Sequence, residues 1–329
     1  MMETKEPRDE FNERTGRTEY WKRKGHELAA MMGPDGLVKQ EFVKFRGVCP
    51  CCGTKPPKEK LLWHKDGLRY VRCGDCGMVF IDPILKTEVL DRIYDNAESS
   101  VAWLDVLQKQ EGLDSEKYTS ILQRLLRYTG SLRDLTLLDV GSSYGLFIHM
   151  ATHYGAKVKG LELCKPAIEL AQRRFPALEV LNEKLESWAV GRESSVDVVT
   201  FLEVLEHVPD PGELLECARD ILKPRGIVVV LVPNLMAKTN LILHEKSKTF
   251  GANHLNYWLA STLTRQFERA NLEVVETSTM IGDVNTWLNY LNYEDPYAGH
   301  LVHPNHDAAT LKTLADGQGY KLLAFARKQ

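Results

Sequence analysis

The chain has 329 residues, 43% of them hydrophobic, which is enough for one large domain or two smaller ones with a buried core. A formal net charge of -3 supplies no overall cationic field, which argues against a protein that binds mainly to the phosphates of nucleic acid. The charged N-terminal stretch lacks the apolar core of a signal peptide, and no stretch approaches about 18 consecutive apolar residues, so we expect a cytoplasmic protein that stays outside membranes.

Four segments follow one another along the chain. Residues 1–45 are polar and are expected to form an N-terminal extension with partial order at best. Residues 46–84 hold paired cysteines and the strand-like stretch "LRYVRCGDCGMVFIDP", which predicts a small module of its own. In residues 85–133, apolar side chains recur at helical spacing, and this predicts a cap of two or three helices.

Residues 134–329 alternate strand-like and helical stretches, beginning with "LTLLDVG" and "KVKGLEL". Apolar strands that alternate with helices predict an α/β fold whose parallel sheet is covered on both faces. A stretch at 285–318 precedes the last strand and is expected to be an insertion that helps to shape the pocket.

The paired cysteines form two CxxC motifs, each followed by glycine. Four thiolates in two close pairs suit tetrahedral zinc, and a site closed by four protein ligands leaves no position for substrate. We therefore expect a structural zinc ion, in a zinc ribbon, held by Cys49, Cys52, Cys73 and Cys76. Cys51 has poorer spacing for this role.

The stretch "LLDVGSSYG" predicts a strand that ends in a tight loop, where Gly141 and Gly145 let the backbone approach a ligand. Glu162 ends the next expected strand about 20 residues after the first loop glycine, where an acid can bind the hydroxyls of a ribose. Asp139 would be an unfavourable neighbour for the pyrophosphate of NAD. The sulfonium and amino groups of S-adenosylmethionine suit it better, and we favour that cofactor.

These features resemble the class I S-adenosylmethionine-dependent methyltransferases, over about residues 134–283. The resemblance implies a Rossmann-like seven-stranded sheet, with "LEVVETSTM" and "YKLLAFARK" as the sixth and seventh strands and the seventh antiparallel. The segment "VDVVTFLEVLEHVPDP" resembles the ubiquinone-biosynthesis O-methyltransferases. The cysteine layout, with the helix around Tyr94, resembles zinc-ribbon methyltransferases of sugar, polysaccharide and natural-product biosynthesis.

The resemblance also implies a set of cofactor contacts. Asp139 and the loop would hold the methionine end, Glu162 the ribose, and Leu163 the face of the adenine. Glu183 would lie near the adenine amino group and Leu202 beside the sulfur. The loop residues concerned are Gly141, Ser142, Ser143 and Gly145, of which Ser143 stands where many relatives have a middle glycine.

Candidates for the acceptor side follow the fourth and fifth strands. Glu203, Glu206 and His207 would share one face of a helical turn, where they could hold a divalent cation that lowers the pKa of a hydroxyl, or could merely fix the turn. His254 is a second candidate. It could be the base that removes the proton of the acceptor hydroxyl, or a structural histidine that only hydrogen-bonds to nearby groups. One loop contains three lysines, Lys238, Lys246 and Lys248. They could bind a phosphate or nucleotide-sugar acceptor, or they could simply lie on a solvent-exposed helix face.

The sequence thus predicts methyl transfer to a small-molecule acceptor, with the hydroxyl of a sugar, nucleotide sugar or secondary metabolite favoured over nitrogen or carbon. One alternative is an RNA methyltransferase that grips nucleic acid with its zinc ribbon, although residues 46–84 offer no obvious aromatic stacking platform. Another is an inactive binding protein, against which the intact Asp139 and Glu162 speak. Nothing in the sequence points to a particular oligomeric state.

Overall fold

A seven-stranded sheet forms the centre of the computed structural model, which describes residues 7–55, 58–96, 98–292, 295 and 297–329. The strand order is β12-β13-β10-β9-β6-β7-β8, and β13 runs antiparallel to both of its neighbours. This confirms the expected class I methyltransferase sheet, including its antiparallel last strand. The strands are β6 (Thr136–Val140), β7 (Lys157–Leu161), β8 (Val180–Leu181), β9 (Val196–Leu202), β10 (Leu222–Pro233), β12 (Leu272–Met280) and β13 (Lys321–Lys328).

Alternate residues of the central strands point into two separate cores. Leu137, Val198 and Val229 face a core made with helices α5, α6 and α7, whereas Leu138 and Val199 face α8, α9 and α11. Burial on both faces explains why these strands are almost entirely apolar. The helices are α5 (Glu111–Thr129), α6 (Leu146–Thr152), α7 (Lys165–Arg174), α8 (Leu185–Trp188), α9 (Pro211–Ile221) and α11 (Ala260–Arg269).

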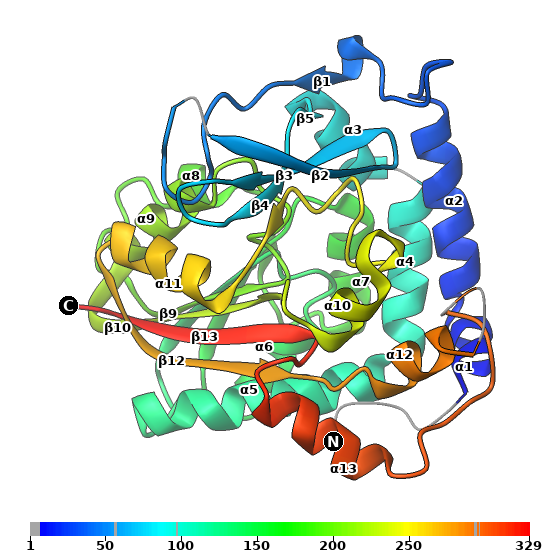
Figure 1. Cartoon of the computed structure of the whole chain (residues 1–329). Helices are drawn as coiled ribbons and strands as arrows, with labels where there is room; N and C mark the ends of the chain where they lie inside the picture. The colour runs from blue at the N-terminus through cyan, green and yellow to red at the C-terminus, as the bar shows by residue number, and fades with distance from the viewer. Residues whose placement is uncertain (1–6, 56–57, 97, 293–294, 296) are drawn as a thin grey trace.

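The cysteine-containing segment forms a second sheet that lies beside the first (Figure 1). Its strands β2 (Glu59–Lys65), β3 (Leu68–Cys73) and β4 (Val79–Ile81) pair in sequence order, and β4 also pairs with β11 (Asn256–Tyr257). Residues of this segment share a core with the central sheet, among them Cys51, Val71 and Phe80. The segment thus forms the expected small sheet, but a strand from the C-terminal half completes it.

The N-terminal residues also differ from expectation. Where partial order was expected, α1 (Arg8–Thr15) and α2 (Arg17–Ala29) form, and Phe11 is buried. In Figure 1, α2 runs alongside α4 (Glu98–Lys109). Tyr20 packs on Trp103 of α4, whereas Phe45 is exposed. Packing on α4 gives these charged helices an apolar partner that the local sequence does not reveal.

The remaining elements connect or cover the two sheets. Two or three helices were expected in the cap, and residues 85–133 form three, α3 (Thr87–Asn96), α4 and α5. The last of them, α5, packs directly on the central sheet. None of the helices in the described part of the chain combines the length and apolar character that crossing a membrane requires. The other elements are η1 (Gln40–Phe42), β1 (Val43–Lys44), β5 (Ile84–Leu85), α10 (Lys238–Leu243), η2 (His244–Lys246), α12 (Val284–Tyr290) and α13 (His306–Ala315). Helix α3 contains Tyr94, whose side chain lies outside the described part.

Candidate functional site

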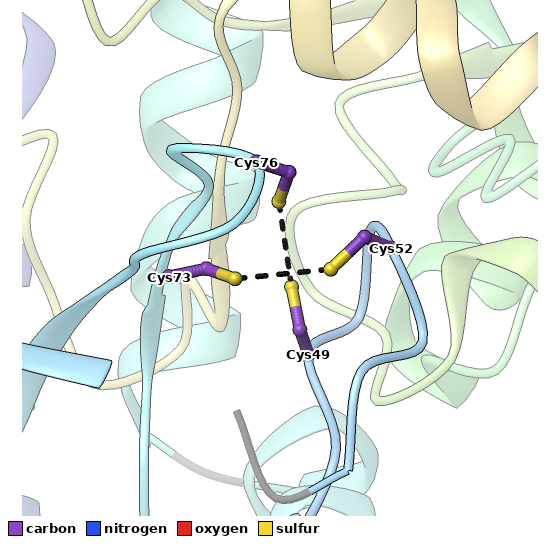
Figure 2. A group of neighbouring side chains, drawn as sticks. All are labelled: Cys49, Cys52, Cys73 and Cys76. Atoms are coloured by element: carbon purple, nitrogen blue, oxygen red, sulfur yellow. Dashed lines mark hydrogen bonds between the residues drawn. The ribbon is translucent and has the colours of Figure 1, made fainter. Parts of the chain in front are cut away.

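The four predicted zinc ligands converge on one point, as Figure 2 shows. The Sγ atoms of Cys49 and Cys76 are 3.6 Å apart, and those of Cys52 and Cys73 are 3.7 Å apart. A tetrahedral ion with Zn–S bonds of about 2.3 Å places its sulfur ligands about 3.8 Å from one another. The geometry therefore fits zinc.

Two equivalent turns build this cluster. The amide of Gly53 donates to the carbonyl of Cys49, and the amide of Gly77 donates to that of Cys73, each at 3.0 Å. Both glycines have φ near +75°, a conformation that other residues adopt rarely. Cys51 lies outside the cluster, with its Sγ 3.5 Å from the carbonyl of Thr262. The glycine that follows each pair was therefore the correct sequence signal.

Asp139 lies on β6 just before the glycine loop and is almost completely buried. Thr200 Oγ1 on the neighbouring strand β9 donates to its carboxylate at 2.5 Å. Burial raises the pKa of Asp139 to about 7, and the charge of Glu162 acts in the same direction. A carboxylate in this position is stabilised by a positive charge brought by a ligand.

The glycine loop needs the backbone freedom that the sequence suggests. Gly141 has φ +74°, and a Cβ atom there would lie 2.5 Å from Cγ2 of Val204. Ser143 also has positive φ, at 50°, a backbone conformation that glycine adopts more readily than serine. The loop therefore packs directly against the turn that follows β9.

Glu162 follows β7 and holds two loops together. Its Oε2 accepts the amide of Ser143 at 2.7 Å, and its Oε1 accepts the amides of Leu163 and Cys164 at 2.7 and 2.8 Å. Burial raises the pKa of Glu162, and these three donors oppose that shift. A carboxylate offers about four acceptor positions, and the three amides occupy three of them. The fourth position, on Oε2, can accept a further hydrogen bond while all three backbone contacts stay in place. This geometry leaves one acceptor position on Glu162 for a ligand hydroxyl.

The other expected cofactor residues lie around the same edge of the sheet. Leu163 is 38% exposed, Glu183 is half-buried in the loop after β8, and Leu202 ends β9. Ser142 is buried and Gly145 precedes α6. Sequence reasoning missed Asn182, whose side-chain amide donates to the carbonyls of Glu162 and Leu163.

The turn after β9 differs from the expected helical turn. Glu203 has φ +64°, so the chain leaves helical geometry at the first of the three expected residues. Its side chain pairs with Lys321 at the start of β13. The prediction that Glu203, Glu206 and His207 share one face is therefore wrong, because the left-handed residue turns Glu203 toward another strand.

Glu206 and His207 instead gather with His254, and one ligand atom from each lies within 4.8 Å of the others. Glu206 is fully buried, and neither carboxylate oxygen has a hydrogen-bond partner among the described residues. Burial raises its pKa well above the usual range, and the charge of Glu203 adds to this. Burial also lowers the pKa of His207 to about 4 and that of His254 well below 6.5, so both imidazoles are neutral at pH 7. The turn with Glu206 and His207 and the loop with His254, expected as separate candidates, thus form one cluster.

Backbone carbonyls orient both imidazoles. His207 Nδ1 is 2.8 Å from the carbonyl of Asn253, and His254 Nδ1 is 2.7 Å from that of Thr249. A carbonyl can only accept, so each Nδ1 carries the proton and each Nε2 carries a lone pair. The ring centroids lie 4.8 Å apart at an angle of 77°.

Asn256, on β11, fixes the turn that carries this cluster, and sequence reasoning missed it. Its side-chain amide donates to the carbonyls of Leu205 and Val208 at 2.9 and 2.8 Å. Arg46, from the start of the cysteine-containing segment, donates to the Asn256 side-chain oxygen at 3.0 Å. A polar residue between apolar neighbours in a short strand was the available signal.

Comparison with known proteins agrees with this architecture. A family model described as a methyltransferase domain matches residues 110–277. The ubiquinone biosynthesis O-methyltransferase of Serratia proteamaculans (strain 568) is 34% identical over 127 residues, which are 37% of this chain and 52% of that protein. The enzyme of the same name from Alkalilimnicola ehrlichii (strain ATCC BAA-1101 / DSM 17681 / MLHE-1) is 36% identical over 118 residues, which are 34% of this chain and 47% of that protein. The chain thus spans about half the length of these curated relatives.

Among solved structures, geranyl diphosphate C-methyltransferase from Streptomyces coelicolor A3(2) matches with a TM-score of 0.46 and 16% identity, over 72% of this chain and 88% of that chain. The matched family region includes the glycine loop, Glu162 and the Glu206–His207–His254 cluster. With the strand order of the sheet and this match over half of its residues, the chain belongs to the class I S-adenosylmethionine-dependent methyltransferases.

Proposed function

We propose that the chain transfers the methyl group of S-adenosylmethionine to a hydroxyl of a small molecule. The observation that carries this proposal is Asp139, a buried carboxylate with a raised pKa beside an open glycine loop. The cationic methionine end of the cofactor matches it, whereas a pyrophosphate would add negative charge. Contact between Gly141 and Val204 brings the turn with Glu206 and His207 next to this loop.

In the proposed reaction, a lone pair of the acceptor oxygen forms the new O–C bond to the methyl group. The C–S bond breaks and its electron pair stays on sulfur, which leaves S-adenosylhomocysteine, and the hydroxyl proton leaves at the cluster. Alignment of the two reactants supplies much of the rate, and removal of the proton contributes about 10²- to 10⁴-fold.

Calorimetry with S-adenosylhomocysteine tests the cofactor assignment. We expect binding to the wild-type protein, and Glu162→Ala to weaken it by about 1 to 3 kcal/mol, because a ribose hydroxyl and the loop amide of Ser143 lose their acceptor. Glu179→Ala is the matched control. Glu179 directly precedes β8, and its exposed carboxylate pairs with Lys159. A preference for NAD over S-adenosylhomocysteine would overturn the proposal.

For proton removal, two arrangements of the same cluster are possible in chemical terms. His254 accepts the proton directly, or a divalent cation held at the cluster lowers the pKa of the hydroxyl. Single-turnover methyl transfer by His207→Ala and His254→Ala, with and without a chelator, separates them. Loss of activity only on substitution of His254 supports the direct base, and loss with a weak chelator that leaves the cysteine-bound zinc in place supports the cation.

An anionic acceptor, such as a nucleotide sugar, is supported by lysines around the loop at 247–253. Lys65 donates to the carbonyl of Ser247, and Lys24 to the side chain of Asn253. Burial lowers the pKa of Lys65 to about 8; the charges of Lys248 and Lys24 act in the same direction, and the charge of Asp66 opposes them. A bound phosphate would relieve that repulsion. A screen of hydroxylated acceptors with and without phosphate groups, using labelled methyl donor, tests this preference.

We also propose that the four-cysteine cluster holds one structural zinc ion. Sulfur spacings of 3.6 and 3.7 Å support this assignment. Elemental analysis of purified protein should find about one zinc per chain, and Cys73→Ser with Cys76→Ser should remove it. Folded protein without metal would contradict the proposal.

A further inference from the structure

A chain of polar side-chain contacts joins the N-terminal helix α2 to the first turns of α5. It runs through Gln110, the residue between α4 and α5. The side-chain oxygen of Gln110 accepts from the guanidinium of Arg17, and its side-chain nitrogen donates to Asp114 Oδ2 at 2.8 Å. Asp114 Oδ1 in turn accepts from Lys117 Nζ at 2.7 Å. The N-terminal segment is thus connected to a helix of the methyltransferase core.

The orientation of the Gln110 side chain depends on both of its neighbours. A guanidinium can only donate hydrogen bonds and an ionised carboxylate can only accept them, so the carboxamide oxygen must face Arg17 and the nitrogen must face Asp114. Gln110 and Asp114 are both buried, and a buried polar group that loses its partner is destabilised. Loss of Arg17 from this position therefore leaves the Gln110 oxygen without its donor and loosens the contact to Asp114.

The far end of the chain lies beside the proposed cofactor site. Tyr118 of α5 packs edge-on against Phe147 of α6, the helix that follows the glycine loop, with ring centroids 5.4 Å apart. Lys117 Nζ lies 4.8 Å from the centroid of the Tyr118 ring. Burial alone would lower the pKa of Lys117, but the groups around it, Asp114 and Glu203 among them, raise it. A positive charge is therefore held close to the end of β9, next to the glycine loop.

Few apolar contacts hold α1 and α2 in place. Among the residues of α2, all of which the structure describes, Leu28 alone is buried, and α1 adds one buried apolar side chain, Phe11. The two helices lie at one edge of the molecule in Figure 1. Segments that bury little apolar surface open locally at a lower free energy than the core strands. The helices can therefore dock and undock while the central sheet stays folded.

We infer that Gln110 is a positioning residue that makes docking of α2 and binding of the cofactor cooperative. When α2 is docked, Arg17 orients Gln110. The oriented carboxamide fixes Asp114 and, through it, the ammonium of Lys117, which can then pair with the carboxylate of the cofactor. The inference rests on the proposed function for the identity of the cofactor.

The docked helix also reaches the acceptor side. Lys24, two helical turns after Arg17, donates to the side chain of Asn253. The backbone carbonyl of Asn253 accepts from Nδ1 of His207 at 2.8 Å. One movement of α2 therefore acts on both sites, and binding of the cofactor helps to complete the site to which the acceptor then adds.

Hydrogen exchange and calorimetry with S-adenosylhomocysteine, on the full-length protein, test the inference. By linkage, docking and binding strengthen each other by the same factor, which is about 5- to 150-fold in typical proteins. Saturating S-adenosylhomocysteine should slow exchange of the α2 amides of the wild type by a factor in this range. Arg17→Met and Gln110→Met should each weaken binding by a comparable factor and abolish the slowing. Arg17→Lys, which keeps a donor, should restore part of both.

Arg23→Met is the matched control, because Arg23 lies on the same helix and pairs with Glu19 at the surface. It should behave like the wild type in both measurements, and exchange in β10 reports that each variant is folded. Once Lys117→Met has broken the far end of the chain, Arg17→Met should weaken binding no further.

Equal effects of Arg17→Met and Arg23→Met, or additive effects of Arg17→Met and Lys117→Met, would overturn the inference and leave the proposed function standing. A wild-type protein that binds no S-adenosylhomocysteine would overturn both.

Discussion

Asp139 shows how one residue connects cofactor recognition with stability. Its carboxylate is buried, accepts one hydrogen bond from Thr200, and has its pKa raised to about 7 by burial. Because the value in the unfolded chain is near 3.8, the native state holds a proton that the unfolded state has lost between about pH 4 and 7. The contribution of Asp139 to the free energy of unfolding therefore falls as pH rises through that window.

Asp139→Asn should consequently stabilise the cofactor-free protein relative to wild type, and increasingly so from pH 4 to pH 8. The asparagine oxygen can still accept the hydrogen bond from Thr200, so the main change is loss of the titrating group. Urea unfolding across this pH range measures the difference. Asp134→Asn, at an exposed carboxylate, controls for the change in net charge. A difference between Asp139→Asn and wild type that does not depend on pH would contradict the prediction.

A second residue-scale prediction concerns the pair of Lys321 and Glu203. Lys321 is 9% exposed, whereas the side chain of Glu203 is 30% exposed, so solvent screens part of the interaction. Lys321→Met should lower the free energy of unfolding by about 1 to 3 kcal/mol, because Glu203 then lies unpaired near Glu206. Adding Glu203→Gln should recover much of this loss.

The exposed pair of Lys159 and Glu179 serves as the comparison, and Lys159→Met should cost less than about 1 kcal/mol. Chemical denaturation of the single and double variants gives all of these values. If the Lys321 and Lys159 variants lose the same stability, burial of the first pair has no energetic consequence.

At the scale of elements, β11 has two roles although it is only two residues long. It adds a strand to the cysteine-containing sheet through β4, and its Asn256 holds the turn that carries Glu206 and His207. The backbone carbonyl of Glu206 also accepts the amides of Leu255 and Asn256. The cysteine-containing segment therefore supports the candidate acceptor site through this strand.

Asn256→Ala should lower the free energy of unfolding by about 2 to 4 kcal/mol, because the carbonyls of Leu205 and Val208 lose their buried donor. Binding of S-adenosylhomocysteine should change little. Asn292→Ala, which removes an exposed contact to the carbonyl of Leu288, should change neither quantity. Unfolding and titration experiments on the two variants check this, and equal behaviour would exclude a positioning role for Asn256.

At the scale of the whole molecule, segments far apart in sequence share cores and contacts. Cys51 and Phe80 pack in one core with Val199 and Val230 of the central sheet. The N-terminal helix α1 reaches the start of the insertion before the last strand, where Arg8 pairs with Asp283 and donates to Thr286. Such shared burial makes the free energy of one part depend on the other.

We therefore expect removal of zinc to destabilise the whole chain and not only the cysteine-containing sheet. Hydrogen exchange followed by mass spectrometry should show strong and similar protection in β3 and β10 when zinc is present. Mild chelation should reduce protection in both strands together. Loss of protection confined to β2, β3 and β4 would mean that this sheet unfolds independently of the methyltransferase core.

The sequence by itself determined the features that depend on local spacing. Two CxxC motifs with following glycines predicted the thiolate cluster, because neighbouring residues on a tight turn must point the same way. Apolar strands with loop signals predicted the central sheet and placed Asp139 and Glu162 at one edge, since parallel strands end on the same side. These predictions needed no knowledge of how distant segments meet.

Tertiary structure decided what depends on contacts between distant residues. The positive φ of Glu203 and its pairing with Lys321 separated it from Glu206, and a loop about 50 residues further along brought His254 to the cluster. Likewise, the pairing of β4 with β11 and a shared core join the cysteine-containing sheet to the central sheet. Periodicity and motif spacing report which face of an element is apolar, but not which distant partner covers it, because packing energy depends on three-dimensional proximity.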